Sequence, residues 1–182
     1  EENILFIFEH TGLYSHKLAV YLSENNYRFS MVSGLEIKRS LGIVRGKDDK
    51  VDSRSIARYG YRMKDEIKLT TLPSEKLRTL KTLLSLRETK VKQRAADKTT
   101  IKEYKRIYTR KNNEILYSVL ESSIKKITQL ILKIETELKA VLKSDEELLR
   151  QYQLLKSIKG VGDIIAINVI VYTDGFTKFK TH

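Results

Sequence analysis

The sequence predicts an α-rich α/β protein in which a small α/β region is followed by a long antiparallel helical coiled coil and a helix-hairpin-helix. Three observations predict this fold class. Short β-rich and helical segments alternate over the first 70 residues, apolar residues recur at spacings of three and four from Tyr117 to Val141, and KGVG separates two helical segments near residue 160.

The composition favours a globular protein with a polyanionic partner. Its 182 residues are 41% hydrophobic, enough for one sizeable domain or two small ones, and 35 basic against 23 acidic residues give a net charge of +12. Nucleic acid is therefore the first candidate partner, and an acidic membrane surface is a distant second. Because there is no cysteine, a metal site would need oxygen ligands. No apolar run is long enough to span a bilayer, so we expect a cytoplasmic protein without a membrane partner.

The first region, residues 1–70, alternates strands with helices. NILFIF is short and apolar like a buried strand, and the helix that follows from residue 13 has Thr11 as a plausible N-cap. YRFSMVS is a second β-rich run, and LEIKRSLGI follows as a short helix. The order β-α-β-α favours two parallel strands packed by helices. A further helix is expected from Asp49 to about Met63, with acids in its first turn.

The second region, residues 73–143, opens at Pro73 with two long helices around a turn at Lys111 to Asn113. The leucine stripe of the first helix turns polar toward Arg94 and Lys98, so we expect that helix to leave or change its partner there. An antiparallel hairpin is the simplest arrangement, and a dimeric coil is the alternative.

The third region, residues 145–182, has the form of a helix-hairpin-helix. Gly160 and Gly162 permit a tight turn whose backbone N–H groups, with the following helix N-terminus, can contact a phosphate. The alternative is a plain turn between core helices.

Three carboxylates are the candidate catalytic and metal-binding residues. Glu9 closes the first strand, where open α/β sheets place their sites, while Asp49 and Asp52 lie three apart at a helix start. If these three carboxylates come together, their oxygen atoms would suit two Mg²⁺ or Mn²⁺ ions, which would catalyse phosphodiester cleavage or transfer. The alternative is that Asp48, Asp49 and Asp52 only cap the helix and pair with neighbouring bases, which are Lys47, Lys50 and Arg54.

Basic residues and the glycine turn are the candidate nucleic-acid contacts. Lysine and arginine side chains that contact phosphates give an affinity for nucleic acid that depends on salt and not on sequence. Tyr104 and Tyr108 can either stack on bases or pack against a neighbouring helix. The predicted contacts are Lys47, Lys98, Lys102, Lys105, Arg106, Lys159, Gly160 and Gly162.

Three segments together resemble the DEDD transposases of the insertion sequence 110 family. EHTGLYSHKLAVYL is similar to that family's E-x-T-G-x-Y segment, GKDDKVDSRSIARY to its K-x-D-x-x-D-A segment, and LLKSIKGVGDIIAINVI to its I-x-G-[IV]-G-x-x-x-A segment. They occur in the family's order over nearly the whole chain. Two residues depart from the family pattern: Asp48 stands where Thr or Asn is usual, and Ser53 stands where Ala is usual.

The resemblance implies a partial RNase H-like domain of the RuvC type, a coiled-coil linker and the start of a C-terminal transposase domain. It implies a DNA recombinase that moves an insertion sequence, works with a guide RNA in bacteria and forms a dimer or tetramer through the coil. By position, Glu9, Asp49 and Asp52 match three of the four metal-binding acids, and Thr11, Gly12 and Tyr14 match the segment that shapes the site.

The resemblance also implies that the chain is truncated at both ends. The family's first aspartate would lie before residue 1 and its proposed serine nucleophile after residue 182, so we expect the chain alone to be incomplete for catalysis. Two hypotheses follow. One is a truncated DEDD recombinase, and the other is a non-catalytic coiled-coil module that binds nucleic acid and supports assembly.

Overall fold

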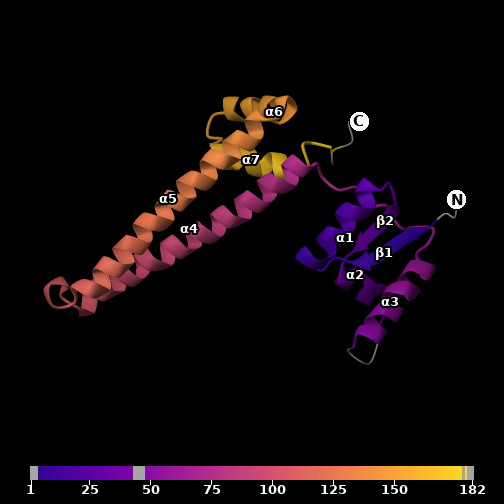
Figure 1. The fold of residues 1–182 in the computed structure, drawn as a ribbon, viewed down its shortest axis with the longest axis horizontal. Coiled ribbons are helices and arrows are strands. Elements are labelled where there is room, and N and C mark those ends of the chain that lie inside the picture. The colour runs from indigo at the N-terminus through magenta and orange to yellow at the C-terminus, as the bar shows by residue number, and fades with distance from the viewer. Residues whose placement is uncertain (1–3, 43–47, 178, 180–182) are drawn as a thin grey trace. The chain divides into compact units, whose positions relative to one another are not determined.

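The computed structural model of the chain describes residues 4–42, 48–177 and 179. The chain divides into two compact units, Glu1–Leu72 and Pro73–His182, which we call unit 1 and unit 2. Helices dominate both units, and the described strands form one small sheet in unit 1. Figure 1 labels the elements.

The described residues of unit 1 form two parallel strands and three helices. In chain order they are β1 (Leu5–Glu9), α1 (Leu13–Glu24), β2 (Arg28–Val32), α2 (Gly34–Leu41) and α3 (Asp49–Arg62) (Figure 1). The strands pair in parallel, with Leu5 beside Arg28 and Glu9 beside Val32. The predicted β-α-β-α order and parallel pairing are therefore confirmed.

Helices cover both faces of this sheet. On one face Ala19 and Leu22 of α1 pack with Phe29. On the other, Ile37 of α2 and Tyr59 of α3 pack with residues of both strands, including Ile7 and Val32. Because side chains alternate along a strand, Glu9 lies on the same face as Ile7, under α2 and α3.

The start of α1 differs from the prediction. Its N-cap is Gly12, with a φ of 67°, and not Thr11. The Ser15 hydroxyl accepts the N–H of Thr11 at 3.1 Å and donates to the carbonyl of Gly12 at 3.1 Å. The residue directly before the helix has a positive φ, which favours glycine at that position. Thr11 therefore lies one residue before the N-cap.

Unit 2 is helical. It contains α4 (Glu75–Ile107), a short 3₁₀ turn η1 (Arg110–Asn112), α5 (Glu114–Lys143), α6 (Glu146–Ser157) and α7 (Asp163–Tyr172). The helices α4 and α5 lie side by side and run in opposite directions, as Figure 1 shows. Contacts along their length fix this direction, with Lys76 beside Ser144, Arg87 beside Glu135 and Arg94 beside Thr128.

The apolar core of unit 2 lies at the base of the hairpin, where α6 and α7 pack onto α4 and α5. Leu80, Leu138 and Ile170 are fully buried there. Toward the turn the contacts become polar, but α4 keeps its partner. The Arg94 guanidinium donates to the Thr128 hydroxyl at 3.4 Å, and the Ser123 hydroxyl donates to Asp97 at 2.6 Å. The expectation that α4 leaves or changes its partner near Arg94 is wrong, because polar pairs replace the leucines.

Over the described residues no helix has both the length and the apolar character needed to cross a membrane. The supercoiling of the hairpin and the competing dimeric coil stay predictions.

Candidate acidic site and nucleic-acid surfaces

Glu9 lies where the sheet meets the start of α2. It is the last residue of β1 and pairs in register with Val32, two residues before Gly34 opens α2. Its carboxylate fills the space of the Cβ that Gly34 lacks. A Cβ built there would lie 2.9 Å from the carboxyl carbon of Glu9 and still closer to one of its oxygens. Glycine at position 34 is therefore what leaves room for this carboxylate at the helix start.

The three aspartates at the start of α3 have different surroundings. Asp48 is the N-cap, and its carboxylate accepts the N–H of Val51 at 2.8 Å. Asp49 and Asp52 occupy the first turn, where the helix dipole favours acids. Within the described part of the chain, neither makes an ion pair or a side-chain hydrogen bond. Capping thus accounts for Asp48 alone. Lys47, a possible partner and a predicted nucleic-acid contact, lies outside the described residues.

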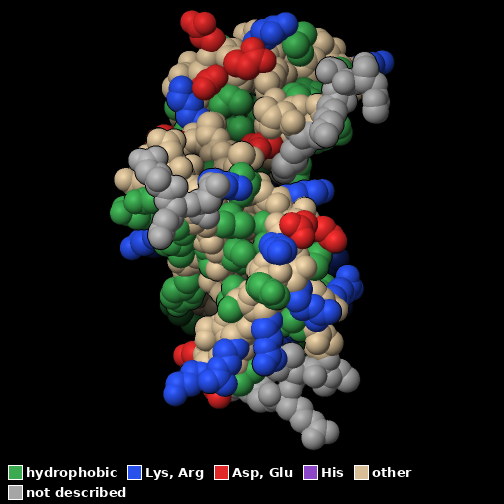
Figure 2. Space-filling view, turned by 90° about the vertical axis from the view of Figure 1, so that its right-hand side faces the viewer, with side chains coloured by type: hydrophobic (Ala, Val, Ile, Leu, Met, Phe, Trp, Pro, Cys, Tyr) green, Lys and Arg blue, Asp and Glu red, His purple; other side chains and the backbone are tan. Residues whose placement is uncertain are grey.

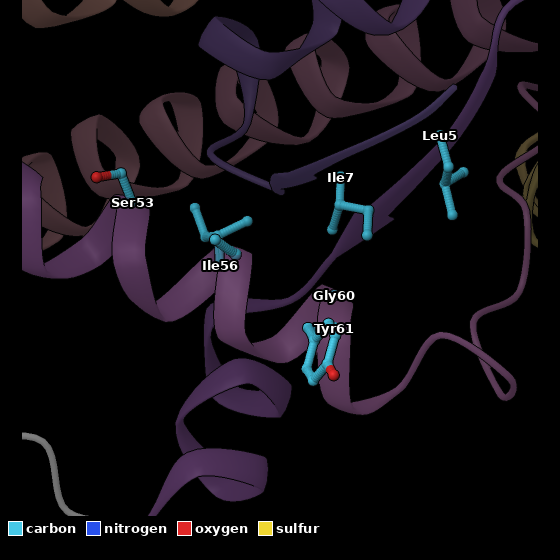
Figure 3. Close-up of a pocket in the computed structure, with 7 residues that line it drawn as sticks. Leu5, Ile7, Ser53, Ile56, Gly60 and Tyr61 are labelled. Carbon is cyan, nitrogen blue, oxygen red and sulfur yellow. The ribbon is translucent and has the colours of Figure 1, made fainter. Parts of the chain in front are cut away.

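The helix α3 runs opposite to β1 on the face that carries Glu9. Gly60 lies against Ile7, since a Cβ at Gly60 would be 2.6 Å from Ile7 Cδ1. Figure 3 shows Ser53 beyond Ile7, on the side away from Leu5, around a surface cavity of about 480 Å³. The carboxyl end of β1 and the start of α3 therefore lie toward the same end of unit 1.

The three predicted acids share this end but do not form one compact cluster. No group of three or more acidic or histidine side chains close enough to hold a metal occurs among the described residues. Helical rise places Asp52 ~12 Å along α3 from Gly60, whereas Glu9 is only ~7 Å along β1 from Ile7. Carboxylates are the oxygen ligands that Mg²⁺ prefers, so the residue types fit this ion. In the structure, however, the three carboxylates are not close enough together to bind one metal ion as a group.

A contact that the sequence reasoning missed ties α3 to α2. The hydroxyl of Tyr59, buried at 3% exposure, donates to the Glu36 carboxylate at 2.6 Å. This hydrogen bond, burial and the charge of Glu36 raise the pKa of Tyr59 to about 12. The inward direction of Tyr59 was predictable from helical spacing, but its partner on another helix was not.

The predicted basic contacts on α4 are exposed. None of the four forms an ion pair with a carboxylate in the described part of the chain, whereas Lys92 on the same helix pairs with Glu88 at 2.6 Å. Their charges are therefore available to a partner. These four residues are Lys98, Lys102, Lys105 and Arg106.

The KGVG turn joins α6 to α7 with Gly160 at a φ of 91° and Gly162 as the N-cap of α7. Asp163, the first residue of α7, pairs with Lys139 and Lys156 at 2.8 Å each. Hydrogen bonds from these two lysines hold the pKa of Asp163 well below its usual range. The start of α7 thus already carries an anion from its own chain. Lys159 is exposed.

Unit 1 carries acids toward the carboxyl end of its sheet, and the exposed basic residues of unit 2 favour a polyanionic partner. The family model of the DEDD transposase of insertion sequence 110, described as a transposase, matches residues 1–107. The chain belongs to this transposase family, as the sequence resemblance predicted, and the family implies DNA as the partner. The matched range includes the first two similar segments, whereas the KGVG segment lies outside it. The match covers unit 1 and α4 to its last residue, Ile107. No curated protein matches the chain significantly.

Proposed function

We propose that this chain is part of a recombinase that cleaves and transfers the DNA strands of an insertion sequence with divalent metal ions. Glu9, Asp49 and Asp52 are the proposed metal ligands, and Mg²⁺ or Mn²⁺ is the proposed ion. Membership of a transposase family supports the reaction class. Oxygen-ligand chemistry and the absence of cysteine support the choice of metal.

One observation carries the assignment of residues. Asp48 alone is used as a helix cap, while Asp49 and Asp52 keep their carboxylates free of partners in the described part of unit 1. The helix dipole favours both acids in the first turn of α3, and this position leaves their carboxylates available to a ligand. A cation supplied from outside would satisfy both.

A bound divalent ion would supply charge stabilisation at the scissile phosphate. The residues of this chain provide the ligands and their support. The Tyr59 to Glu36 hydrogen bond holds α3 against α2, and Gly34 leaves the space that the Glu9 carboxylate fills.

The test compares two neighbouring aspartates. In the complete gene product, Asp52→Asn should lower Mg²⁺-dependent strand cleavage by about 10²-fold or more, because a charged transition state loses a ligand of its counter-ion. Asp48→Asn removes the same charge but keeps a good N-cap, so it should retain most activity. Thermal stabilisation by Mn²⁺ should fall in the first variant only. Equal activity of both variants would contradict the assignment.

A non-catalytic role in nucleic-acid binding and assembly is the second candidate. The separation of Glu9 from Asp49 and Asp52 favours it, since the described residues form no group of three ligands. Under this hypothesis neither aspartate variant changes metal binding, and nucleic-acid affinity is unchanged in both.

The remaining parts of the proposal concern partners and organisation. We propose that the protein works in the bacterial cytoplasm with a guide RNA, and that the hairpin of α4 and α5 forms a dimer or tetramer. We also propose that residues 145–182 begin a second domain, and that Lys159, Gly160 and Gly162 contact phosphate. Exposed apolar residues on α5, including Ile115, Val119 and Leu132, support an oligomer contact. On the face drawn in Figure 2, hydrophobic side chains are likewise exposed among Lys and Arg side chains.

A further inference from the structure

The turn at the far end of the α4–α5 hairpin encloses a surface cavity of about 330 Å³, which we call the tip pocket. Its wall includes Lys105, Arg106, Ile107, Tyr108 and Tyr117. Basic and apolar side chains are thus exposed together at one place. Ile107 is 73% exposed and Tyr108 is 42% exposed.

The backbone of the tip pocket is held by its own network. The guanidinium of Arg110 makes two hydrogen bonds to Glu114 and two to Glu121, and it lies 5.6 Å from the ring centre of Tyr117. The Tyr117 hydroxyl donates to the backbone carbonyl of Tyr108 at 2.9 Å, and Tyr117 is only 1% exposed. These contacts hold the backbone at Tyr108 in the structure.

Some of the basic side chains at the tip pocket form ion pairs within the turn, and others are exposed without such a pair among the described residues. Arg110 is neutralised by its two glutamates, whereas Lys105 and Arg106 have no carboxylate partner within the described residues. From Lys98 to Glu121 the chain carries six basic residues against three acids, two of which pair with Arg110. The free cations therefore favour a polyanion, and the exposed Tyr108 ring offers a flat apolar surface beside them.

We propose that the tip pocket binds single-stranded nucleic acid, with Lys105 and Arg106 on the phosphates and the Tyr108 ring stacked on an unpaired base. In a duplex the base faces are covered by their neighbours, so an aromatic ring gains little. Tyr104 packs edge to face on Tyr108, with ring centres 5.7 Å apart, and steadies it. This inference rests on the proposed nucleic-acid partner, but its contact residues belong to unit 2, whereas the proposed metal ligands belong to unit 1.

The first test uses the 182-residue chain and fluorescence anisotropy with labelled oligo-dT, oligo-U and a blunt DNA duplex. Tyr108→Ala should weaken single-strand binding by about 5- to 100-fold, while Tyr108→Phe should bind like the wild type. Duplex affinity should change little in either. The Tyr117 hydrogen bond survives in both variants because it uses the backbone carbonyl of residue 108. The two oligonucleotides show whether DNA or RNA is preferred.

The second test separates the tip pocket from general charge. Lys105→Gln with Arg106→Gln should lower the dependence of log affinity on log salt by about 1.4 for a single strand. Lys125→Gln with Lys126→Gln removes the same charge from exposed positions of α5 and should leave that slope unchanged. Equal effects of both pairs would overturn the proposal, and so would unchanged single-strand binding by Tyr108→Ala.

Two other outcomes are informative. If Tyr108→Ala abolished self-association of the chain in light scattering and left oligonucleotide binding intact, the apolar surface would be a protein contact and the proposal would fail. Asp52→Asn should bind single strands like the wild type. Loss of cleavage in that variant and loss of binding in Tyr108→Ala therefore report on separate hypotheses.

Discussion

The carboxylate of Glu9 occupies the volume that a Cβ on residue 34 would need, so its present position at the start of α2 depends on glycine at position 34. Gly34 is not in the left-handed region that favours glycine, and it opens a helix with Ser33 as its cap. The requirement is therefore space and not backbone conformation.

Gly34→Ala should move the Glu9 carboxylate with little loss of stability. The overlapping atoms belong to the end of a flexible side chain, which can rotate away, so the unfolding free energy should change by less than about 1 kcal/mol. Displacement of a ligand by about 1 Å should lower metal-dependent cleavage by about 10²-fold. Unchanged cleavage in Gly34→Ala would contradict a role for Glu9 as ligand.

Tyr59→Phe should destabilise unit 1 by about 1 kcal/mol, because it removes a hydrogen bond to a charged acceptor that is itself exposed. The pKa of Tyr59 is raised from 10.0 to about 12, so the neutral phenol stabilises the folded state. That contribution is complete below pH 10 and is lost as pH rises toward 12. Urea unfolding of the wild type and of Tyr59→Phe across this pH range should show that the difference between their unfolding free energies becomes smaller as pH rises. Tyr61→Phe, at a 79% exposed residue, should change nothing.

Asp163→Asn should destabilise unit 2 by about 1 kcal/mol after allowance for solvent screening, since Lys139 and Lys156 lose their common partner. The pKa of Asp163 is lowered from 3.8, so its contribution is complete above that pH and is lost as pH falls below it. Thermal unfolding at pH 7 and pH 3 should show a smaller difference at the lower pH. Glu146→Gln, at an exposed first-turn position, is the control. Equal losses in both variants would contradict the role of the shared carboxylate.

Arg110→Lys should loosen the hairpin turn without unfolding the molecule. An ammonium cannot make parallel hydrogen bonds to two carboxylates, so the turn loses most of its restraint. Amide exchange from Tyr108 to Asn113 should become faster, while the midpoint of thermal unfolding shifts by less than about 2 °C. Arg106→Lys makes the same change at a residue that has no acidic partner among the residues that the structure describes, and it should leave exchange unaltered. Slow exchange in Arg110→Lys would show that the turn is held by other contacts.

Patterns that depend on neighbouring residues were predictable from the sequence. The helix from Asp49 and the buried seam through Tyr117, Ile131 and Leu138 follow from local spacing, and the parallel pair β1–β2 follows from the β-α-β order of the elements. Contacts between distant positions were not. The polar pairs around Arg94 keep α4 on α5 where the apolar pattern ends, and no local rule indicates Thr128 as its partner. The Tyr59 to Glu36 hydrogen bond is missing from the prediction for the same reason.

The acidic site was predictable in residue type but not in arrangement. Spacing places Asp49 and Asp52 on one helix, and the strand pattern places Glu9 at its end. How far α3 extends past β1 depends on where Gly60 contacts Ile7, which tertiary packing alone decides.

The helix α5 sets the distance between the two ends of the hairpin of unit 2. Lys139, which contacts the start of α7 through Asp163, and Glu114, which contacts Arg110, lie on one continuous helix. The helical rise separates them by ~38 Å. A single strand too short to cover this distance could therefore contact the KGVG turn or the tip pocket, but not both.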